Sequence, residues 1–144
     1  MKKLLILLFS FFLLSSTSVF GQEDLSKVNI DDLKRLSNSE IISIFSNTLE
    51  MGYQSYQGVT TRYNNYTYSN GDFEFETSSH TESGKWKVYE NQICWKSTLK
   101  SNGIIDKMFQ CALVYTDFNE GEYYFYIPGI GVYGKSTAII NLID

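Results

Sequence analysis

Hydrophobic residues follow a helical period in the segment 37–52 and a period of two after it. The apolar positions of the first segment, SNSEIISIFSNTLEMG, lie on one helical face: Ile41, Ile44, Phe45 and Leu49. Ser37, with Glu40 three residues later, forms a capping box, and Gly52 is a suitable stop. The pattern predicts an amphipathic helix that begins at Ser37, ends near Gly52 and packs on the rest of the fold.

From Tyr53 onward, β-branched and aromatic residues dominate with a period of two, and turn dipeptides recur roughly every ten residues. This pattern is typical of an antiparallel β-meander. We therefore predict an α+β fold, in which one N-terminal helix packs on a meander of about seven strands. The curved sheet could stay a half barrel or close completely.

Two hairpins can be placed from their turn dipeptides. Asn70-Gly71 favours a type I′ turn with two-residue closure. This closure predicts the opposite pairs Tyr68 with Phe73 and Tyr66 with Phe75, with Thr67, Glu74 and Glu76 on the other face. A turn at Glu90-Asn91 predicts the pairs Val88 with Ile93 and Trp86 with Trp95. In both hairpins the large apolar residues share one face.

A third turn, at Asn102-Gly103, gives facing residues whose numbers sum to 205, as those of Cys94 and Cys111 do. Alternation from the turn makes them a non-hydrogen-bonded pair, with Cα atoms about 4.5 Å apart. That separation lies within the range of a disulfide. We predict that Cys94 and Cys111 are bonded, because an exported protein with cysteines so placed should oxidise them.

The N-terminus is predicted to be a signal peptide, residues 1–21. Lys2 and Lys3 precede an apolar run at 4–14, and small residues follow up to the cleavage point after Gly21. The run is about half the ~20 residues that a membrane-spanning helix needs. We therefore expect an exported protein, periplasmic or extracellular, with no integral membrane segment after cleavage. Residues 22–36 are expected to form a poorly ordered lead or one extra helical turn, and 37–144 to form a single domain.

Charge excludes one class of partner. Without Lys2 and Lys3 the chain keeps 10 of its 12 basic residues against 16 acidic ones, a formal charge of −6. The remaining basic residues form no stripe, so nucleic acid is not an expected partner. We also expect no cofactor and no metal site.

The segment Pro128 to Ser136, PGIGVYGKS, matches the Walker A pattern through Gly129, Gly134, Lys135 and Ser136. A phosphate-binding loop of that kind follows a buried parallel strand and opens a helix. Here only a short β-branched tail follows Ser136. We interpret the match as fortuitous and the segment as a hairpin connection whose glycines supply positive φ.

Other candidate chemistry is sparse. The single histidine, His80, lies in a polar stretch and is expected to be a solvated loop residue. A glycoside hydrolase would need paired carboxylates facing a cleft, and the candidate pairs are Glu74 with Glu76 and Glu120 with Glu122. Asn65-Tyr66-Thr67 fits the N-glycosylation pattern. Most aromatic residues are expected in the core, and four tyrosines remain as candidate ligand or partner contacts: Tyr53, Tyr56, Tyr63 and Tyr133.

A family resemblance rests on the order of several short motifs. These are SEIISIF, Gly52, SNGD at 69–72, GKWKVYENQICW at 84–95 and CALVY at 111–115, followed by a tyrosine-rich strand. Over 37–133 the chain resembles the small exported bacterial proteins of domain-of-unknown-function family 995. The resemblance implies a signal peptide, a short helix, a G-x-W-x-V strand and two cysteines in adjacent strands, but no activity.

These observations favour a non-enzymatic binding or envelope-associated module. One alternative is a lipocalin-like carrier of a small apolar ligand, which needs a barrel with an open interior. Another is an inhibitor or partner of an envelope enzyme, which would use an exposed loop. The glycoside hydrolase is the enzymatic alternative. The oligomeric state is left open.

Overall fold

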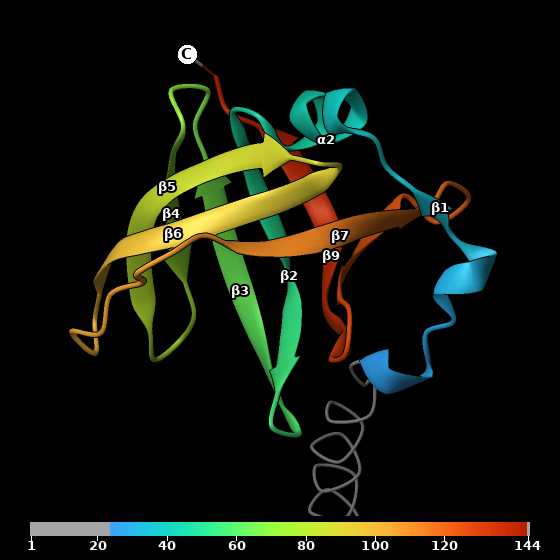
Figure 1. The fold of residues 1–144 in the computed structure, drawn as a ribbon, viewed down its shortest axis with the longest axis horizontal. Coiled ribbons are helices and arrows are strands. Elements are labelled where there is room, and N and C mark those ends of the chain that lie inside the picture. Colours follow the sequence, from blue (N-terminus) through green and yellow to red (C-terminus); the bar gives the residue numbers. More distant parts are fainter. Residues whose placement is uncertain (1–23, 144) are drawn as a thin grey trace, which may run out of the picture.

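Eight antiparallel strands form a closed barrel in the computed structural model, which describes residues 24–143 (Figure 1). The strands are β2 (Thr48–Tyr56), β3 (Val59–Thr67), β4 (Asp72–Glu76), β5 (Thr81–Tyr89), β6 (Gln92–Lys100), β7 (Gln110–Asp117), β8 (Glu122–Ile127) and β9 (Gly131–Asn141). Each strand pairs with the next one in the chain, and β9 returns to pair with β2. The predicted meander is confirmed, and the barrel closes. It has one strand more than the predicted seven, and a short ninth strand, β1, lies outside it.

The chain before the helix also contains regular structure. Two 3₁₀ turns, η1 (Leu25–Lys27) and η2 (Ile30–Asp32), precede β1 (Lys34–Arg35). Strand β1 pairs with β7, and Figure 1 shows it beside that strand. Leu25 and Leu36 are buried. The expected poorly ordered lead is therefore packed against the barrel from residue 24 onward, and the predicted signal peptide and its cleavage point lie outside the described residues.

The helix α2 (Asn38–Phe45) begins with the predicted capping box, in which Ser37 and Glu40 bond to each other's backbone amides. It is shorter than predicted. Asn47 takes a φ of 57°, which ends the helix, and β2 starts at Thr48. Leu49 and Gly52 are consequently strand residues, so Gly52 is no helix stop. A Cβ at Gly52 would lie 2.1 Å from the carbonyl oxygen of Lys135, so glycine there allows β9 to approach β2.

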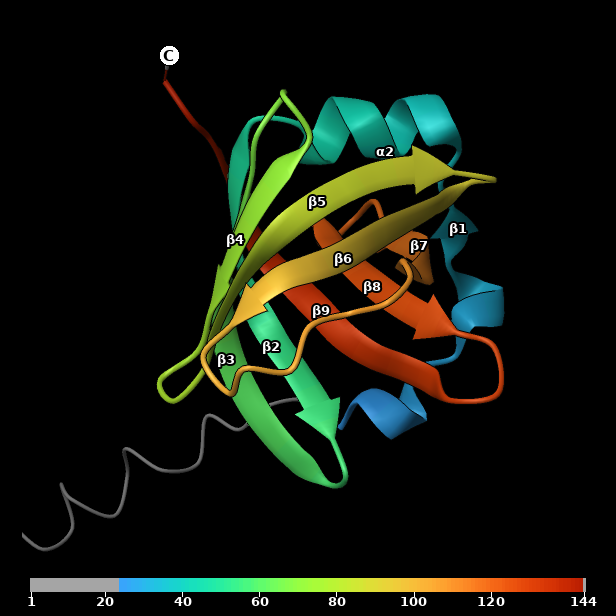
Figure 2. The same cartoon turned by 60° about the vertical axis from the view of Figure 1, so that its left-hand side comes forward.

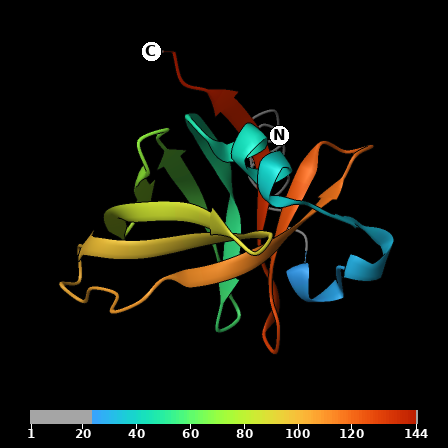
Figure 3. The same ribbon diagram turned by 45° about the horizontal axis from the view of Figure 1, so that its top comes forward.

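Helix α2 covers one end of the barrel (Figures 2 and 3). Phe45 is fully buried, and its ring lies 5.5 Å from that of Tyr123 and 5.8 Å from that of Phe125. The hydroxyls of Thr48 and Thr67 both donate to the carbonyl of Phe45 and tie the helix end to two strands. The rest of this core consists of Leu36, Ile41, Phe73, Trp86, Ile93, Ala112 and Val114. Among the described residues, 24 to 143, no helix is long and apolar enough to cross a membrane.

The predicted disulfide is present. Cys94 and Cys111 are opposite each other in β6 and β7, with Cα atoms 4.0 Å apart. The pairs predicted around the Glu90-Asn91 turn are also observed, and both turn residues have positive φ, as a type I′ turn requires. Beyond the Trp95–Gln110 pair the two strands separate, so the predicted tight hairpin turn at Asn102-Gly103 is not formed. Residues 101–109 form a loop in which the Asp106 amide donates to the Ser97 carbonyl at 2.9 Å.

The register predicted for the Asn70-Gly71 hairpin is wrong by one residue. Phe73 pairs with Thr67 and Phe75 pairs with Asn65, rather than with Tyr68 and Tyr66. The turn is a three-residue loop, in which only Gly71, at φ 90°, has the left-handed conformation and adds a bulge. Because side chains alternate between faces, this one-residue slip moves Thr67 and Asn65 into the barrel.

Candidate functional site

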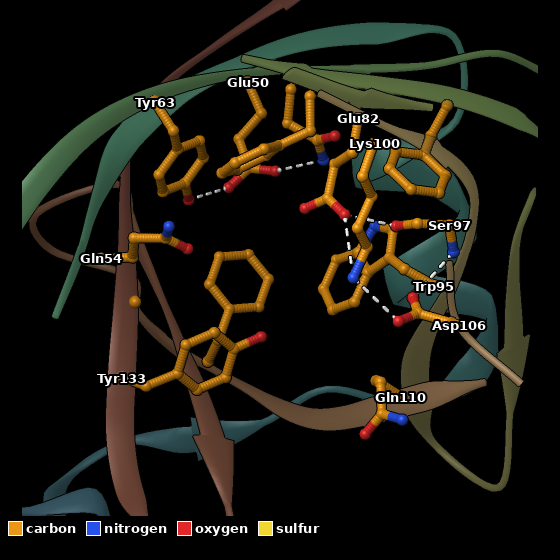
Figure 4. Close-up of a pocket in the computed structure, with 15 residues that line it drawn as sticks. Glu50, Gln54, Tyr63, Glu82, Trp95, Ser97, Lys100, Asp106, Gln110 and Tyr133 are labelled. Atoms are coloured by element: carbon orange, nitrogen blue, oxygen red, sulfur yellow. Dashed lines mark hydrogen bonds and ion pairs between the residues drawn. The ribbon is translucent and has the colours of Figure 1, made fainter. Parts of the chain in front are cut away.

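The barrel interior contains a cavity of about 230 Å³. It lies beyond the apolar core, toward the barrel end remote from α2. All eight barrel strands, β2 to β9, contribute residues, together with Asp106 of the loop before β7. Figure 4 shows these side chains arranged around an open middle, with Tyr63 and Glu50 on one side and Lys100 and Asp106 on another.

The deepest polar group of the cavity is the carboxyl of Glu50, which is 1% exposed. The Tyr63 hydroxyl donates to Glu50 Oε1 at 2.5 Å, and Asn65 Nδ2 donates to Oε2 at 3.3 Å. Burial raises the pKa of Glu50 from 4.5 to about 7, against the opposing effect of these two hydrogen bonds. The carboxyl therefore changes its charge near neutral pH, which is unusual for glutamate.

Two tyrosines and one asparagine surround this carboxyl. Burial, followed by the proximity of Glu50, raises the pKa of Tyr63 and of Tyr133, so both rings stay neutral at physiological pH. Asn65 is 4% exposed, and its Oδ1 accepts no hydrogen bond from any residue in the range 24–143. An unpartnered buried acceptor is costly, so this atom is available to a donor that enters the cavity.

Aromatic rings form the apolar walls. The rings of Tyr63 and Phe75 lie 5.4 Å apart, those of Trp95 and Phe125 5.9 Å, and those of Phe125 and Tyr133 6.3 Å. At Gly134 a Cβ would lie 3.3 Å from the Phe125 ring, so the absence of a side chain leaves room for that ring. A flat apolar group would find ring faces on several sides of the cavity.

A charged cluster lies where the cavity approaches solvent. The Lys100 ammonium is 2.8 Å from Asp106 and 3.6 Å from Glu82, and the Ser97 hydroxyl donates to Glu82. Burial opposes ionisation of Asp106, but hydrogen bonds from Lys100 and from the Ser97 amide outweigh it and lower the pKa of Asp106. The hydrogen bond to Asp106 raises the pKa of Lys100. Lys100 and Asp106 therefore form an ionised pair beside Glu82.

The structure brings together two of the four tyrosines proposed as contacts. Tyr63 and Tyr133 line the cavity. Tyr53 does not, because it follows the inward-facing Gly52 on β2 and pairs with Arg62 and Lys135. Tyr56, at the end of β2, is 73% exposed. A ligand contact at Tyr63 and Tyr133 stays a prediction.

The four carboxylates considered for hydrolysis do not meet at the cavity. Glu74, Glu76 and Glu120 are exposed. Glu122 is partly buried outside the cavity and lies 2.6 Å from the ammonium of Lys135. His80 lies in the β4–β5 connection, where its Nδ1 contacts the Ser101 hydroxyl at 3.0 Å.

In the Walker-like segment, Pro128 to Ile130 connect β8 to β9 as a hairpin, as predicted, and Gly131 to Ser136 are the first residues of β9. Gly129 and Gly131 have φ values of 84° and 101°, and the Ile130 amide donates to the Ile127 carbonyl. Ser136 is followed by further residues of β9 rather than by a helix. The lysine of the motif, Lys135, is 6% exposed and pairs with Glu122.

Sequence patterns missed Glu50, Asn65, Lys100 and Asp106. Glu50 lay within the predicted helix, which was too long, so it was not assigned to a strand. Asn65 was noted only as part of a glycosylation pattern, and its buried position contradicts that role. Lys100 and Asp106 lie beyond irregularities in strand pairing that turn dipeptides do not reveal. Within residues 24–143, no group of three or more His, Cys, Asp and Glu side chains is arranged to hold a metal ion.

The architecture thus comprises a capped barrel, an internal cavity with a buried carboxyl, and a charged cluster at its mouth. Comparisons with protein-family models, with curated proteins and with solved structures find no match to this chain. The resemblance to domain-of-unknown-function family 995 therefore stays a prediction.

Proposed function

We propose that this protein is an exported, non-enzymatic binding module that holds one small, mostly apolar ligand inside its barrel. The observation that carries the proposal is the cavity itself, with aromatic walls and a few convergent polar groups. Ligand sites in proteins generally combine apolar walls with a small number of placed polar groups. This is the lipocalin-like alternative, now favoured over a partner-binding loop.

The cavity volume limits the size of the ligand. A cavity of roughly 150 Å³ lined by apolar side chains can admit benzene, and this one is about 230 Å³. It suits a molecule with one ring or a small fused pair of rings. Larger lipids would have to extend through the mouth, past Lys100 and Asp106.

A binding role is favoured over catalysis by the way in which the cavity carboxylates are held. Both oxygens of Glu50 already accept hydrogen bonds from protein groups. Glu82 and Asp106 are engaged by Lys100 and by Ser97. Side chains held in fixed positions by such bonds can orient the donor group of a ligand, which is what a binding site requires.

The disulfide supports the proposed setting. Bonds such as Cys94–Cys111 persist in oxidising compartments, which agrees with the predicted signal peptide. We propose a periplasmic or extracellular location, and we keep the family 995 resemblance as part of this proposal.

The proposal is tested by native mass spectrometry of the exported protein purified from its own host, repeated after denaturation. A small mass excess that disappears on denaturation is the expected result. Gln54→Trp should abolish the excess, because Gln54 lines the cavity and the larger side chain fills it. Ser55→Trp is the matched control, since Ser55 is the next residue on β2 and does not line the cavity.

Other outcomes reject the proposal. A bare mature mass in the wild-type protein would count against a resident ligand, and an excess equal to a protein mass would favour the inhibitor or partner alternative. An excess that Gln54→Trp leaves intact would place the ligand outside the barrel.

A further inference from the structure

The charges around the cavity are unbalanced. Three carboxyl groups border it, those of Glu50, Glu82 and Asp106, and one ammonium group, that of Lys100. Lys100 is already shared between Glu82 and Asp106 at the mouth. No ion pair recorded for the described part of the chain includes Glu50, so its carboxylate has no cation deep in the barrel.

One hydrogen-bond acceptor beside Glu50 is left without a partner within the described residues. The Tyr63 hydroxyl and the Asn65 amide nitrogen both donate to Glu50. Asn65 Oδ1 then remains as an acceptor without a partner among residues 24–143. Glu50 and Asn65 both line the cavity, so together they supply acceptors to it.

The surrounding rings favour a cation as well. The faces of aromatic rings attract cations within about 6 Å of the ring centre, and most strongly in sites that exclude water. Tyr63, Phe75, Trp95, Phe125 and Tyr133 all border the same space. A positively charged group near Glu50 would therefore meet both carboxylate and ring electron density.

We propose that the ligand of this cavity is a small protonated amine with a flat apolar body, its ammonium group placed at Glu50 and Asn65. This inference rests on the proposed function and specifies the class of ligand. The ammonium donates three hydrogen bonds and neutralises the buried carboxylate. The apolar body lies against Trp95 and Phe125.

A neutral alcohol is the rival ligand, since it can donate one hydrogen bond to Asn65 Oδ1. It would leave Glu50 either protonated or as an unpaired buried charge, which is unfavourable. Benzylamine and benzyl alcohol have nearly the same shape and differ in this one group. Comparing them therefore separates charge recognition from simple filling of the cavity.

The test is isothermal titration calorimetry, in which each compound is titrated into the mature, oxidised protein at pH 8. We expect benzylamine to bind at least about tenfold more tightly than benzyl alcohol, the scale of a hydrogen bond to a charged group. In Glu50→Gln this preference should fall below about threefold. Glu120→Gln, in an exposed turn, is the matched control and should keep the wild-type preference.

The pH profile gives a second readout that needs no variant. Binding of the ammonium requires ionised Glu50, so benzylamine affinity should rise between pH 6 and pH 8 while benzyl alcohol affinity does not. The other groups that face Glu50 are Tyr63, Asn65 and Tyr133, and neither tyrosine changes charge in this interval. His80 contacts Glu82, at 3.9 Å, and not Glu50, so His80→Gln should show the same profile. If Glu50→Gln fails to fold, the pH profile of the wild-type protein still tests the inference.

Two results would overturn the inference, and they have different consequences for the proposed function. Equal binding of both compounds, lost in Gln54→Trp, would reject the amine and leave the cavity as a binding site. Binding of neither compound would also reject the amine. The proposed function would then fail only if native mass spectrometry showed no ligand.

Discussion

The buried carboxyl of Glu50 should make the protein less stable as pH rises through neutrality. In the folded state its pKa is about 7, compared with 4.5 for an ordinary glutamate. The folded protein therefore binds more protons than the unfolded chain between these values. By linkage, the free energy of unfolding falls as pH increases across this interval, and the loss is complete above the folded pKa.

The size of the effect follows from the two pKa values. Each pKa unit corresponds to 1.36 kcal/mol, so Glu50 should cost about 3 kcal/mol of stability at pH 9 relative to pH 4. Below pH 4.5 the carboxyl of Glu50 is mainly protonated in both the folded and the unfolded states, so its charge does not lower the free energy of unfolding. Glu50→Gln removes the titrating group. The free energy of unfolding of the variant, relative to that of wild type, should therefore increase by about 3 kcal/mol from pH 4 to pH 9.

The assay is urea unfolding of the mature protein, followed by tryptophan fluorescence at closely spaced pH values. The quantity of interest is the change with pH in the stability difference between wild type and Glu50→Gln, because constant packing differences cancel. Glu120→Gln serves as the control, with a difference that stays flat over the same range. A flat profile for Glu50→Gln, or a wild type that gains relative stability as pH rises, would refute the reasoning.

Three further predictions concern packing and use the same unfolding assay near pH 6. Replacing Cys94 and Cys111 together with serine should lower the free energy of unfolding by about 3 kcal/mol, as expected for a cross-link that closes a short loop. Gly52→Ala should cost roughly 1–3 kcal/mol, because its Cβ would lie 2.1 Å from the Lys135 carbonyl oxygen. Phe45→Ala should cost about 3–5 kcal/mol, since the ring is fully buried under the barrel end.

Each of these predictions has a control. For Gly52→Ala it is Ser55→Ala, on β2 and outside the cavity, and for Phe45→Ala it is Ile42→Ala, on α2 at 49% exposure. For the disulfide, adding reductant should leave the stability of the serine double variant unchanged. The first two controls should stay within about 0.5 kcal/mol of wild type. A Gly52→Ala variant as stable as wild type would mean that β2 and β9 do not approach closely. A cost below about 1 kcal/mol for Phe45→Ala would contradict its packing role.

Local signals in the sequence predicted the features that depend on neighbouring residues. The capping box at Ser37 and Glu40 and the two-residue turn at Glu90-Asn91 both form as expected. The disulfide followed from counting positions across one turn. The register between Gln92 and Trp95 agrees with that count. The tight turn at Asn102-Gly103 from which the count began does not join the strands, because residues 101–109 form a longer loop.

The interior of the barrel was not predictable in the same way. Alternation indicates that one face of a strand is apolar, but β2 and β3 turn Glu50 and Asn65 inward. Glu50 is compatible with burial because Asn65 and Tyr63 both donate hydrogen bonds to its carboxyl. The bulge at Gly71 also places on the inside of the barrel the face of β3 that was predicted to lie outside. No residue in the turn distinguishes the observed three-residue loop from the predicted two-residue turn.

The pairing of β2 with β9 has a consequence for the order in which the chain can fold. It joins the first barrel strand to the last, and the Asn47 side chain donates to the Leu142 carbonyl, 95 residues away. Contacts of such separation form late, because a long loop must be ordered first. The barrel therefore cannot close until the residues of β9 are present, so β2 to β8 alone leave two unpaired strand edges.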